Sequence, residues 1–234
     1  MKIEGSVVFV TGANRGLGLA YARAALAAGA KKVYAAARDP ASIQLEGVVP
    51  VALDVTRADQ VEAAACACGD VTLLINNAGI SRSAGLLGSP DAFEAARAEL
   101  ETNVFGPWAM TRAFAPALKA NGGGAVVNVL SVLSWLSLPG AATYCVSKSA
   151  AWSLSNGLRN ELRGQGTRVT SVHIAFMDTD MASKIPGDKI SPDEVARQTF
   201  EAVEAGLPEV LADAVTRQVK AGLVAQPPAY AAAR

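Results

Sequence analysis

A tyrosine and a lysine in the second half of the chain could together form a tuned proton donor or acceptor. Tyr144 and Lys148 are four residues apart, so on a helix they would share one face. A free phenol has a pKa of about 10, but a nearby ammonium favours the phenolate and brings the group closer to neutral pH. Taken alone, the pair could equally be an ordinary surface contact worth a few tenths of a kcal/mol.

A glycine-rich stretch near the N-terminus is suited to binding a phosphate. Residues 11–18 read TGANRGLG and follow the apolar run Val7–Val10. Glycines here would permit a tight turn and let backbone amides approach a pyrophosphate at the N-terminus of the next helix. The spacing is neither G-x-G-x-x-G nor that of an ATP-binding P-loop. Because such a turn also serves ordinary strand–helix packing, another motif must decide between the two.

The elements that would position these residues alternate between valine-rich apolar runs and alanine-rich segments of helical spacing. Nearly continuous apolar runs are expected of strands that a parallel sheet buries on both faces. The predicted strands are Val7–Val10, Lys32–Ala36, Val48–Leu53, Val71–Ile75, Ala125–Leu130, Arg168–Ile174 and Glu209–Leu211. The predicted helices are Gly16–Ala28, Arg57–Cys66, Pro90–Lys119, Tyr144–Arg163 and Pro192–Glu204, two of them beginning at Ser-Pro. This alternation predicts an α/β fold: one doubly wound, mainly parallel seven-stranded sheet with helices on both faces, in a single domain over residues 1–234 with a loose tail from about residue 226.

Further polar residues stand where the predicted strands end, at the edge where open α/β sheets bind ligands. Asp54 closes the third strand, Asn76-Asn77-Ala78-Gly79 closes the fourth and Ser131 follows the fifth. Tyr144 and Lys148 open the next helix, so all these side chains are expected at one edge of the sheet.

Composition indicates a compact globular protein. Of 234 residues, 51% are hydrophobic and 18% are charged, which excludes disorder, and 21 basic residues balance 21 acidic ones. This neutral balance argues against a nucleic-acid partner. No apolar run approaches the roughly 20 residues of a membrane helix, and the start lacks a signal sequence. We therefore expect a cytoplasmic protein with no membrane or nucleic-acid partner.

The cysteines and the single histidine are expected to be inert. Cys66, Cys68 and Cys145 suggest reduced thiols, and Cys66-x-Cys68 lacks the second ligand pair of a metal site. His173 lies in an apolar run and is expected to pack within a strand. The sequence thus predicts no metal site.

Three motifs occur in order: T-G-x-x-x-G-x-G, N-N-A-G and Y-x-x-x-K. Together they resemble the short-chain dehydrogenase/reductase family in its short single-domain form, from Val7 to about Gly222. The resemblance implies a Rossmann fold, a nicotinamide cofactor and hydride transfer to or from a small-molecule carbonyl or alcohol. A sugar-nucleotide epimerase or dehydratase shares Tyr-x-x-x-Lys but needs a further C-terminal substrate region.

The resemblance assigns catalytic roles to Asn103, Ser131, Tyr144 and Lys148. Ser131 precedes Tyr144 by the family's interval of thirteen residues, unlike the nearby Ser134, and would polarise and orient the substrate carbonyl. Tyr144 would exchange a proton with the substrate oxygen, and Lys148 would lower the pKa of Tyr144 and hold the nicotinamide ribose. Asn103 matches the asparagine that positions a water for the proton relay.

The implied cofactor contacts lie along the same sheet edge. They are Gly12, Asn14, Arg15, Gly16, Leu17, Gly18, Arg38, Asp54, Val55, Asn76, Ala78, Gly79, Tyr144, Lys148 and Thr179. Thr179 matches a threonine that meets the nicotinamide amide, although Ile174-Ala175 replaces the family's usual Pro-Gly. A lid at about 180–191 is expected to be small.

Charges after the second strand favour NADP(H) over NAD(H). Members of the family that prefer NAD carry an acid here, which accepts the ribose hydroxyls and would repel a 2′-phosphate. In our register this position is Ala37, followed by Arg38, and Arg15 is a second cation. Two arginines suit charge-assisted contacts to a phosphate. A shift of one residue would put Asp39 at the acid position and reverse the preference.

Uncharged residues are available to line a substrate pocket: Leu133, Trp135, Leu136, Leu138, Phe176 and Met177. They favour an apolar or aromatic ketone or aldehyde, or the corresponding alcohol, although Leu136 and Leu138 could belong to the core. The alternative is a catalytically silent NADP-binding regulatory or scaffold protein of the same fold, which would usually have lost the serine, tyrosine or lysine. The resemblance also implies a homodimer or homotetramer that packs through the helices around Asn103–Lys119 and Tyr144–Arg163.

Overall fold

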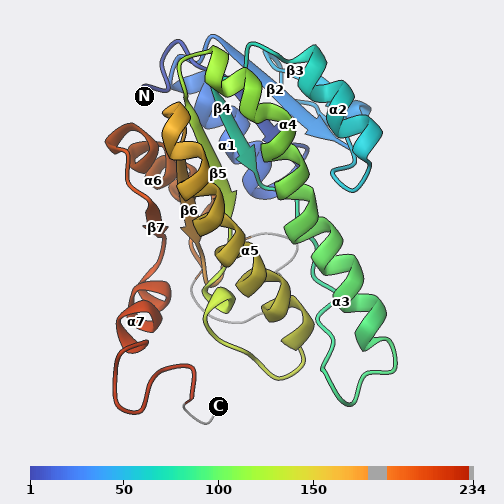
Figure 1. Ribbon diagram of the computed structural model, residues 1–234, viewed down its shortest axis with the longest axis vertical. Coiled ribbons are helices and arrows are strands. Elements are labelled where there is room, and N and C mark those ends of the chain that lie inside the picture. Colours follow the sequence, from blue (N-terminus) through green and yellow to red (C-terminus); the bar gives the residue numbers. More distant parts are fainter. Residues whose placement is uncertain (179–188, 232–234) are drawn as a thin grey trace.

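The centre of the protein is one seven-stranded sheet, seen in a computed structural model that describes residues 1–178 and 189–231. The strands are β1 (Val7–Thr11), β2 (Lys32–Ala37), β3 (Val49–Ala52), β4 (Leu73–Asn76), β5 (Ala125–Val129), β6 (Arg168–His173) and β7 (Glu209–Leu211). Their order is β3-β2-β1-β4-β5-β6-β7, and every neighbouring pair is parallel (Figure 1). The predicted α/β fold with a parallel seven-stranded sheet is confirmed.

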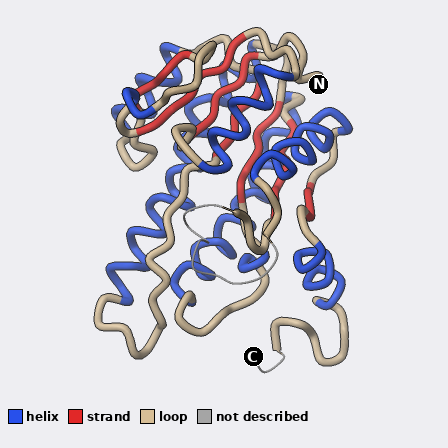
Figure 2. Tube along the Cα trace, turned by 180° about the vertical axis from the view of Figure 1, so that it is seen from behind, coloured by secondary structure: helices blue, strands red, loops and turns tan. Residues whose placement is uncertain are grey.

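Helices cover both faces of this sheet. They are α1 (Gly16–Ala27), α2 (Ala58–Ala67), α3 (Ala92–Leu100), α4 (Gly106–Ala120), α5 (Ala142–Leu162), α6 (Pro192–Ala205) and α7 (Ala214–Gly222). Residues of α1 and α6 fill the core on one face, and residues of α2, α4 and α5 fill it on the other. Figure 2 shows the sheet from behind, between its helical layers. None of the helices that the structure describes has the length and apolar character needed to cross a bilayer.

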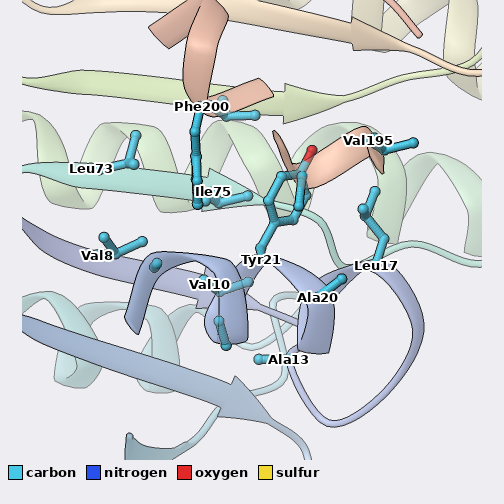
Figure 3. Packing of buried hydrophobic residues seen from close by; sticks show 14 of the residues in the cluster. Val8, Val10, Ala13, Leu17, Ala20, Tyr21, Leu73, Ile75, Val195 and Phe200 are labelled. Atoms are coloured by element: carbon cyan, nitrogen blue, oxygen red, sulfur yellow. The ribbon is translucent and has the colours of Figure 1, made fainter. Parts of the chain in front are cut away.

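Side chains of β1 point alternately to the two faces of the sheet and contribute to the core on each face. Val8 and Val10 pack into the cluster under α1 and α6, where Tyr21 is fully buried (Figure 3). Phe9 points to the opposite face and contacts Phe114 of α4, with ring centroids 4.9 Å apart. Successive side chains of a strand point to opposite faces, so a sheet covered on both sides requires an apolar residue at each position.

The segment predicted as one helix over Pro90–Lys119 is divided by a π-helical turn, Glu101–Phe105, between α3 and α4. Pro107 has no N–H and therefore cannot donate to the carbonyl of Asn103 four residues earlier. The amide of Gly106 instead bonds the carbonyl of Glu101, five residues back. A turn of this kind is often found at functional sites, and here it carries Asn103.

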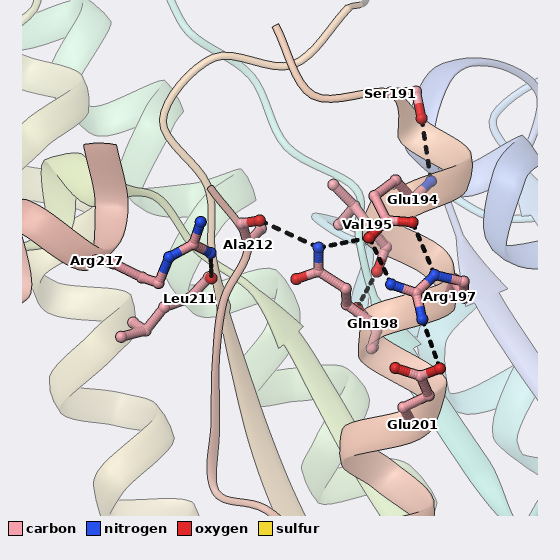
Figure 4. Close-up of polar contacts among 10 residues, drawn as sticks. Ser191, Glu194, Val195, Arg197, Gln198, Glu201, Leu211, Ala212 and Arg217 are labelled. Carbon is pink, nitrogen blue, oxygen red and sulfur yellow. Dashed lines mark hydrogen bonds and ion pairs between the residues drawn. The ribbon is translucent and has the colours of Figure 1, made fainter. Parts of the chain in front are cut away.

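The start of α6 agrees with the predicted Ser-Pro signal. The hydroxyl of Ser191 accepts a hydrogen bond from the amide of Glu194, and Pro192 occupies the first turn (Figure 4). The Gln198 amide donates to the carbonyl of Ala212 at 3.2 Å, which ties α6 to the chain just after β7. This end of the sheet is thereby joined to the helix that covers it.

Both edge strands are short. β3 spans four residues and contains Pro50, and β7 spans three. The Leu53 amide donates to the carbonyl of Ala37 at 2.9 Å. The backbone N–H groups of odd-numbered residues on this strand therefore point towards β2, and those of even-numbered residues point away from the sheet. Pro50 therefore turns its nitrogen away from the sheet, which is the position a proline tolerates in an edge strand.

Candidate active site

The strand ends bring the predicted polar residues together at one edge of the sheet. Asn77, after β4, donates from its side chain to the carbonyls of Thr11 and Gly12, at 2.9 and 3.1 Å. The Thr11 hydroxyl in turn accepts from the amides of Asn77 and Ala78, each at 3.0 Å. These bonds fix the glycine-rich turn to the end of the central strand. Thr11 and Asn77 were not among the predicted site residues, although both lie inside the motifs.

The glycine-rich turn needs its glycines for two separate reasons. Gly12 and Gly16 have φ angles of +65° and +54°, where side chains are strained. At Gly18, a Cβ would lie 2.0 Å from the carbonyl oxygen of Gly12 and 2.6 Å from the Asn77 amide nitrogen. The turn therefore closes only with glycine at this position, whereas Leu17 points into the core.

The N-terminus of α1 fits the pyrophosphate of a dinucleotide. The N-cap residue Arg15 does not cap the helix with its side chain, and the first turn of the helix contains no acidic residue. Backbone amides at a helix N-terminus and the helix dipole both favour an anion at this position. Asn14 and Arg15 lie in the same turn, as predicted.

The charges after β2 agree with the register assumed from the sequence. Ala37 is the last residue of β2 and pairs with Ala52, so Arg38 follows the strand directly. The Asp39 carboxylate accepts from the amide of Ala41 at 3.0 Å and caps its own short turn. The Asp39 carboxylate is thus engaged with the backbone of the turn that follows it.

Asp54 and Val55 lie at the end of the neighbouring strand β3. Burial alone would raise the pKa of Asp54, but hydrogen bonds from the Thr56 amide and hydroxyl, with the charge of Arg38, lower it. Val55 is buried against Gly106, where a Cβ would come within 2.8 Å of a Val55 methyl. Asp54 is thus held as a carboxylate next to Arg38.

Lys148 lies inside the fold, under the ring of Tyr144. The side chain is buried, and Nζ donates to the carbonyl of Val129 at 2.9 Å and stands 5.6 Å from the ring centroid of Tyr144. Burial lowers the pKa of Lys148 to about 8. The pKa of Tyr144 is raised above its usual value, first by burial and then by the charges of Cys145 and Glu99. The lowering of the Tyr144 pKa that was expected from Lys148 is not found, since burial and the charges of Cys145 and Glu99 set the direction of the shift.

Ser131 follows the end of β5, two residues after Val129, whose carbonyl accepts from Lys148. Its hydroxyl accepts from the amide of Leu133 at 3.1 Å and donates weakly to the carbonyl of Ile174 at 3.3 Å. The fully buried His173 of β6 contacts the Ser131 carbonyl through Nδ1 at 3.1 Å, and burial lowers its pKa to about 4. His173 is therefore a packed strand residue, as predicted, and it lies directly behind the serine.

The side chain of Asn103, which lies in the π-helical turn, is fixed by three hydrogen bonds to residues outside that turn. Its carbonyl oxygen accepts from the amide of Ile80, and its amide nitrogen donates to the carbonyl of Ile80 and to the hydroxyl of Ser147, all at 2.9 Å. In addition, Gly79 lies so close that a Cβ there would be 3.2 Å from Asn103 Oδ1 and 3.9 Å from Lys148 Nζ. Asn103, Gly79 and Lys148 thus meet at one place.

A small cavity of about 10 Å³ lies beneath these residues, lined among others by Asn76, Asn103, Val129 and Lys148. The carbonyl oxygen of Asn76 is buried and has no hydrogen-bond partner among the described residues. A cavity of this volume holds about one water when polar groups line it. The site therefore has room for an ordered water next to Asn103 and Lys148.

The predicted substrate walls are only partly available. Trp135 and Leu136 are buried with Val132 and Val219 in a small core cluster. They line a separate hollow of about 390 Å³ on the face of α5 that carries Cys145 and Val146, opposite to Tyr144 and Lys148. The short helical turn after Ser131 directs these two side chains away from the site. Thr179, and most of the predicted lid at 180–191, lie outside the described residues.

Comparison with known proteins adds the family. The family model described as short chain dehydrogenase matches residues 6–189. Galactitol 2-dehydrogenase (L-tagatose-forming) of Cereibacter sphaeroides is 35% identical over 79% of this chain and 76% of its own. A 3-oxoacyl-[acyl-carrier-protein] reductase of Thermotoga maritima is 31% identical, covering 85% of this chain and 82% of its own.

Solved structures agree with this match. A short chain dehydrogenase from Burkholderia cenocepacia in complex with NADP superposes with a TM-score of 0.93, at 44% identity over 97% of this chain and 96% of that one. A short chain dehydrogenase/reductase from Burkholderia phymatum in complex with NAD has a TM-score of 0.81, at 25% identity over 95% of each chain. The glycine-rich turn, the N-N-A-G strand end and the Tyr-x-x-x-Lys helix agree with these matches, and this chain belongs to the short-chain dehydrogenase/reductase family of oxidoreductases.

Proposed function

We propose that the protein is an NADP(H)-dependent carbonyl reductase or alcohol dehydrogenase. Its substrate is an apolar or aromatic ketone or aldehyde, or the corresponding alcohol. The observation that carries this proposal is the buried Lys148 ammonium under the ring of Tyr144, at the same sheet edge as Ser131. Burying a cation costs free energy of folding, and buried groups with perturbed pKa values are concentrated at functional sites.

Each site residue has a defined part in the reaction. When bound, the nicotinamide supplies or takes up the hydride. Ser131 turns its hydroxyl to the substrate oxygen, and Tyr144 donates a proton to that oxygen in reduction and accepts it in oxidation. Lys148 donates one of its three N–H groups to the carbonyl of Val129, and the other two can donate to ribose hydroxyls. Asn103 lines the adjoining cavity, and a water held there would return a proton to the site.

The preference for NADP(H) rests on Arg38. It follows β2 directly, and Asp39 is engaged in its own cap. The structural relative from Burkholderia cenocepacia has NADP bound, and the one from Burkholderia phymatum has NAD bound. Arg38→Ala is expected to weaken NADPH binding about tenfold or more while leaving NADH binding nearly unchanged, since only the former carries the 2′-phosphate. Titration of both dinucleotides checks this, and equal losses for the two would refute the assignment.

The decisive experiment combines binding with turnover. NADPH and NADH are titrated, and each is then tested with a panel of aromatic and aliphatic ketones. We expect turnover with NADPH that falls by about 10²–10⁴-fold in Tyr144→Phe, with NADPH binding retained. Tight NADPH binding without turnover on any carbonyl would instead favour a silent regulatory protein of the same fold. Activity confined to carboxylate-bearing ketones would contradict the apolar substrate class.

We further propose that two or four copies of the chain assemble through α4 and α5. Phe105 and Trp108, at the start of α4, are each 48% exposed and stack on each other with centroids 6.4 Å apart. A stacked pair of large apolar rings on the surface marks a face suited to packing against a partner. We also propose that residues 1–234 form a single domain.

A further inference from the structure

A five-residue segment after β4, Ile80–Ala84, is tied down at three points around the candidate catalytic residues. Ile80 exchanges two hydrogen bonds with the side chain of Asn103. Ala84 exchanges two with Thr143: the amide of Ala84 donates to the Thr143 hydroxyl, and the amide of Thr143 donates to the carbonyl of Ala84. Because Thr143 directly precedes Tyr144, the segment is joined to the first turn of the helix that carries the phenol.

The middle of this segment is held by a buried carboxylate. Glu99, on α3, is 0% exposed, and its Oε1 accepts from the amides of Arg82 and Ser83 at 2.6 and 3.2 Å. Its Oε2 is buried and has no hydrogen-bond partner among the described residues. Burying a carboxylate lowers the stability of the fold unless hydrogen bonds compensate for the lost hydration.

Packing alone does not explain an acid at this position. The other buried residues of α3 are Ala92 and Ala95, so an apolar side chain would suit the same helix face. Ser83 is the one described non-glycine residue with a positive φ, +54°, a conformation that a side chain adopts only when its surroundings hold it there. The carboxylate binds the amides of Ser83 and its neighbour, which supplies that restraint.

We propose that Glu99 is a positioning residue for the reaction: its carboxylate fixes Ile80–Ala84 beside Tyr144 and so shapes the wall against which the carbonyl substrate lies. The inference rests on the proposed function for its kinetic part. Its structural part, the anchoring of the segment by Glu99, stands independently of any substrate.

Two variants of similar size separate anchoring from packing. Glu99→Met fills the space without an acceptor, whereas Glu99→Gln keeps a carbonyl oxygen that can take the two amides. Glu94→Gln is the matched control, because Glu94 lies on the same helix and pairs with the exposed guanidinium of Arg82 and not with the backbone of the segment. Amide hydrogen exchange at Arg82 and Ser83 is measured first, without substrate or cofactor. We expect exchange about tenfold to a hundredfold faster in Glu99→Met, little change in Glu99→Gln and none in Glu94→Gln.

Kinetics then test whether the segment Ile80–Ala84 contacts the substrate. With an active ketone, Glu99→Met is expected to raise KM about tenfold while the Kd of NADPH stays the same, and Glu99→Gln is expected to restore most of the loss. Unchanged exchange in Glu99→Met overturns the proposal, whether or not the wild type turns over a carbonyl. Faster exchange in Glu99→Met with an unchanged KM would contradict the proposed contact between the segment and the substrate. Faster exchange in Glu99→Met, combined with a wild-type protein that reduces no carbonyl, would count against the proposed function alone.

Discussion

Lys148 is held inside the protein at a cost to folding. Its pKa falls from 10.5 to about 8, which corresponds to roughly 3 kcal/mol of unfavourable burial of the charged form. Lys148→Met should therefore raise the melting temperature of the cofactor-free protein at pH 7 by several degrees, because the charge is no longer buried. Scanning calorimetry of both proteins measures this. A lower melting temperature for the variant would mean that the bond to Val129 stabilises the fold more than burial of the ammonium destabilises it.

The same lysine sets a dependence of stability on pH. The folded protein binds this proton more weakly than the unfolded chain does, so wild-type stability should rise as the pH increases from about 8 towards 10.5. In Lys148→Met this rise should be absent. Denaturant titrations of both proteins at pH 7.5 and 9.5 compare the two slopes, and parallel behaviour would contradict the lowered pKa.

Whether a single residue could be predicted depended on whether its role is visible in the local sequence or arises only from a contact with a distant segment. Tyr144, Lys148 and Asn103 belong to motifs whose side-chain chemistry and spacing are visible in the sequence. Glu99 and Thr143 act by binding the backbone of a distant segment, and nothing in their own neighbourhood indicates which amides they will meet. Trp135 was expected in the substrate pocket and is in the core, because the turn after Ser131 decides which way its side chain points.

At the scale of elements, the junction of β1, α1 and the end of β4 leaves no room for added volume at Gly18. In Gly18→Ala the new methyl would meet the backbone of Gly12 at 2.0 Å, and backbone cannot give way as a flexible side chain can. We expect a loss of about 3 kcal/mol or more and no measurable NADPH binding. Gly164→Ala is the control, since nothing lies within 4 Å of a Cβ there. Urea unfolding and dinucleotide titration of both variants give the comparison, and equal stability of the two would contradict the close approach.

Elements were predicted well where their pattern is local. The strands and the Ser-Pro start of α6 were found within one or two residues, because burial on both faces and a proline in the first turn both leave a clear sequence pattern. The π-helical turn was missed: the segment on both sides keeps helical spacing, and only Pro107 signals that a hydrogen bond must be skipped. The prediction of a parallel sheet was correct because no strand pair has the short connection that a hairpin needs.

At the scale of the whole molecule, assembly should depend on the exposed rings of α4. Trp108→Glu places a charge where two copies would meet, so sedimentation velocity should show a shift from dimer or tetramer to monomer. Leu87→Ser removes a fully exposed apolar residue of a loop and should leave the assembly unchanged. A wild-type protein that sediments as a monomer would overturn the proposed assembly.

The edges of the sheet bear on how this protein behaves when crowded. An open edge strand offers a row of amides and carbonyls to any passing strand, which is how sheets grow into aggregates. Here β7 offers only three residues, and on β3 the outward-facing position at Pro50 carries no hydrogen to donate. Both edges therefore offer little to a strand of another copy, and growth by strand addition is disfavoured at each.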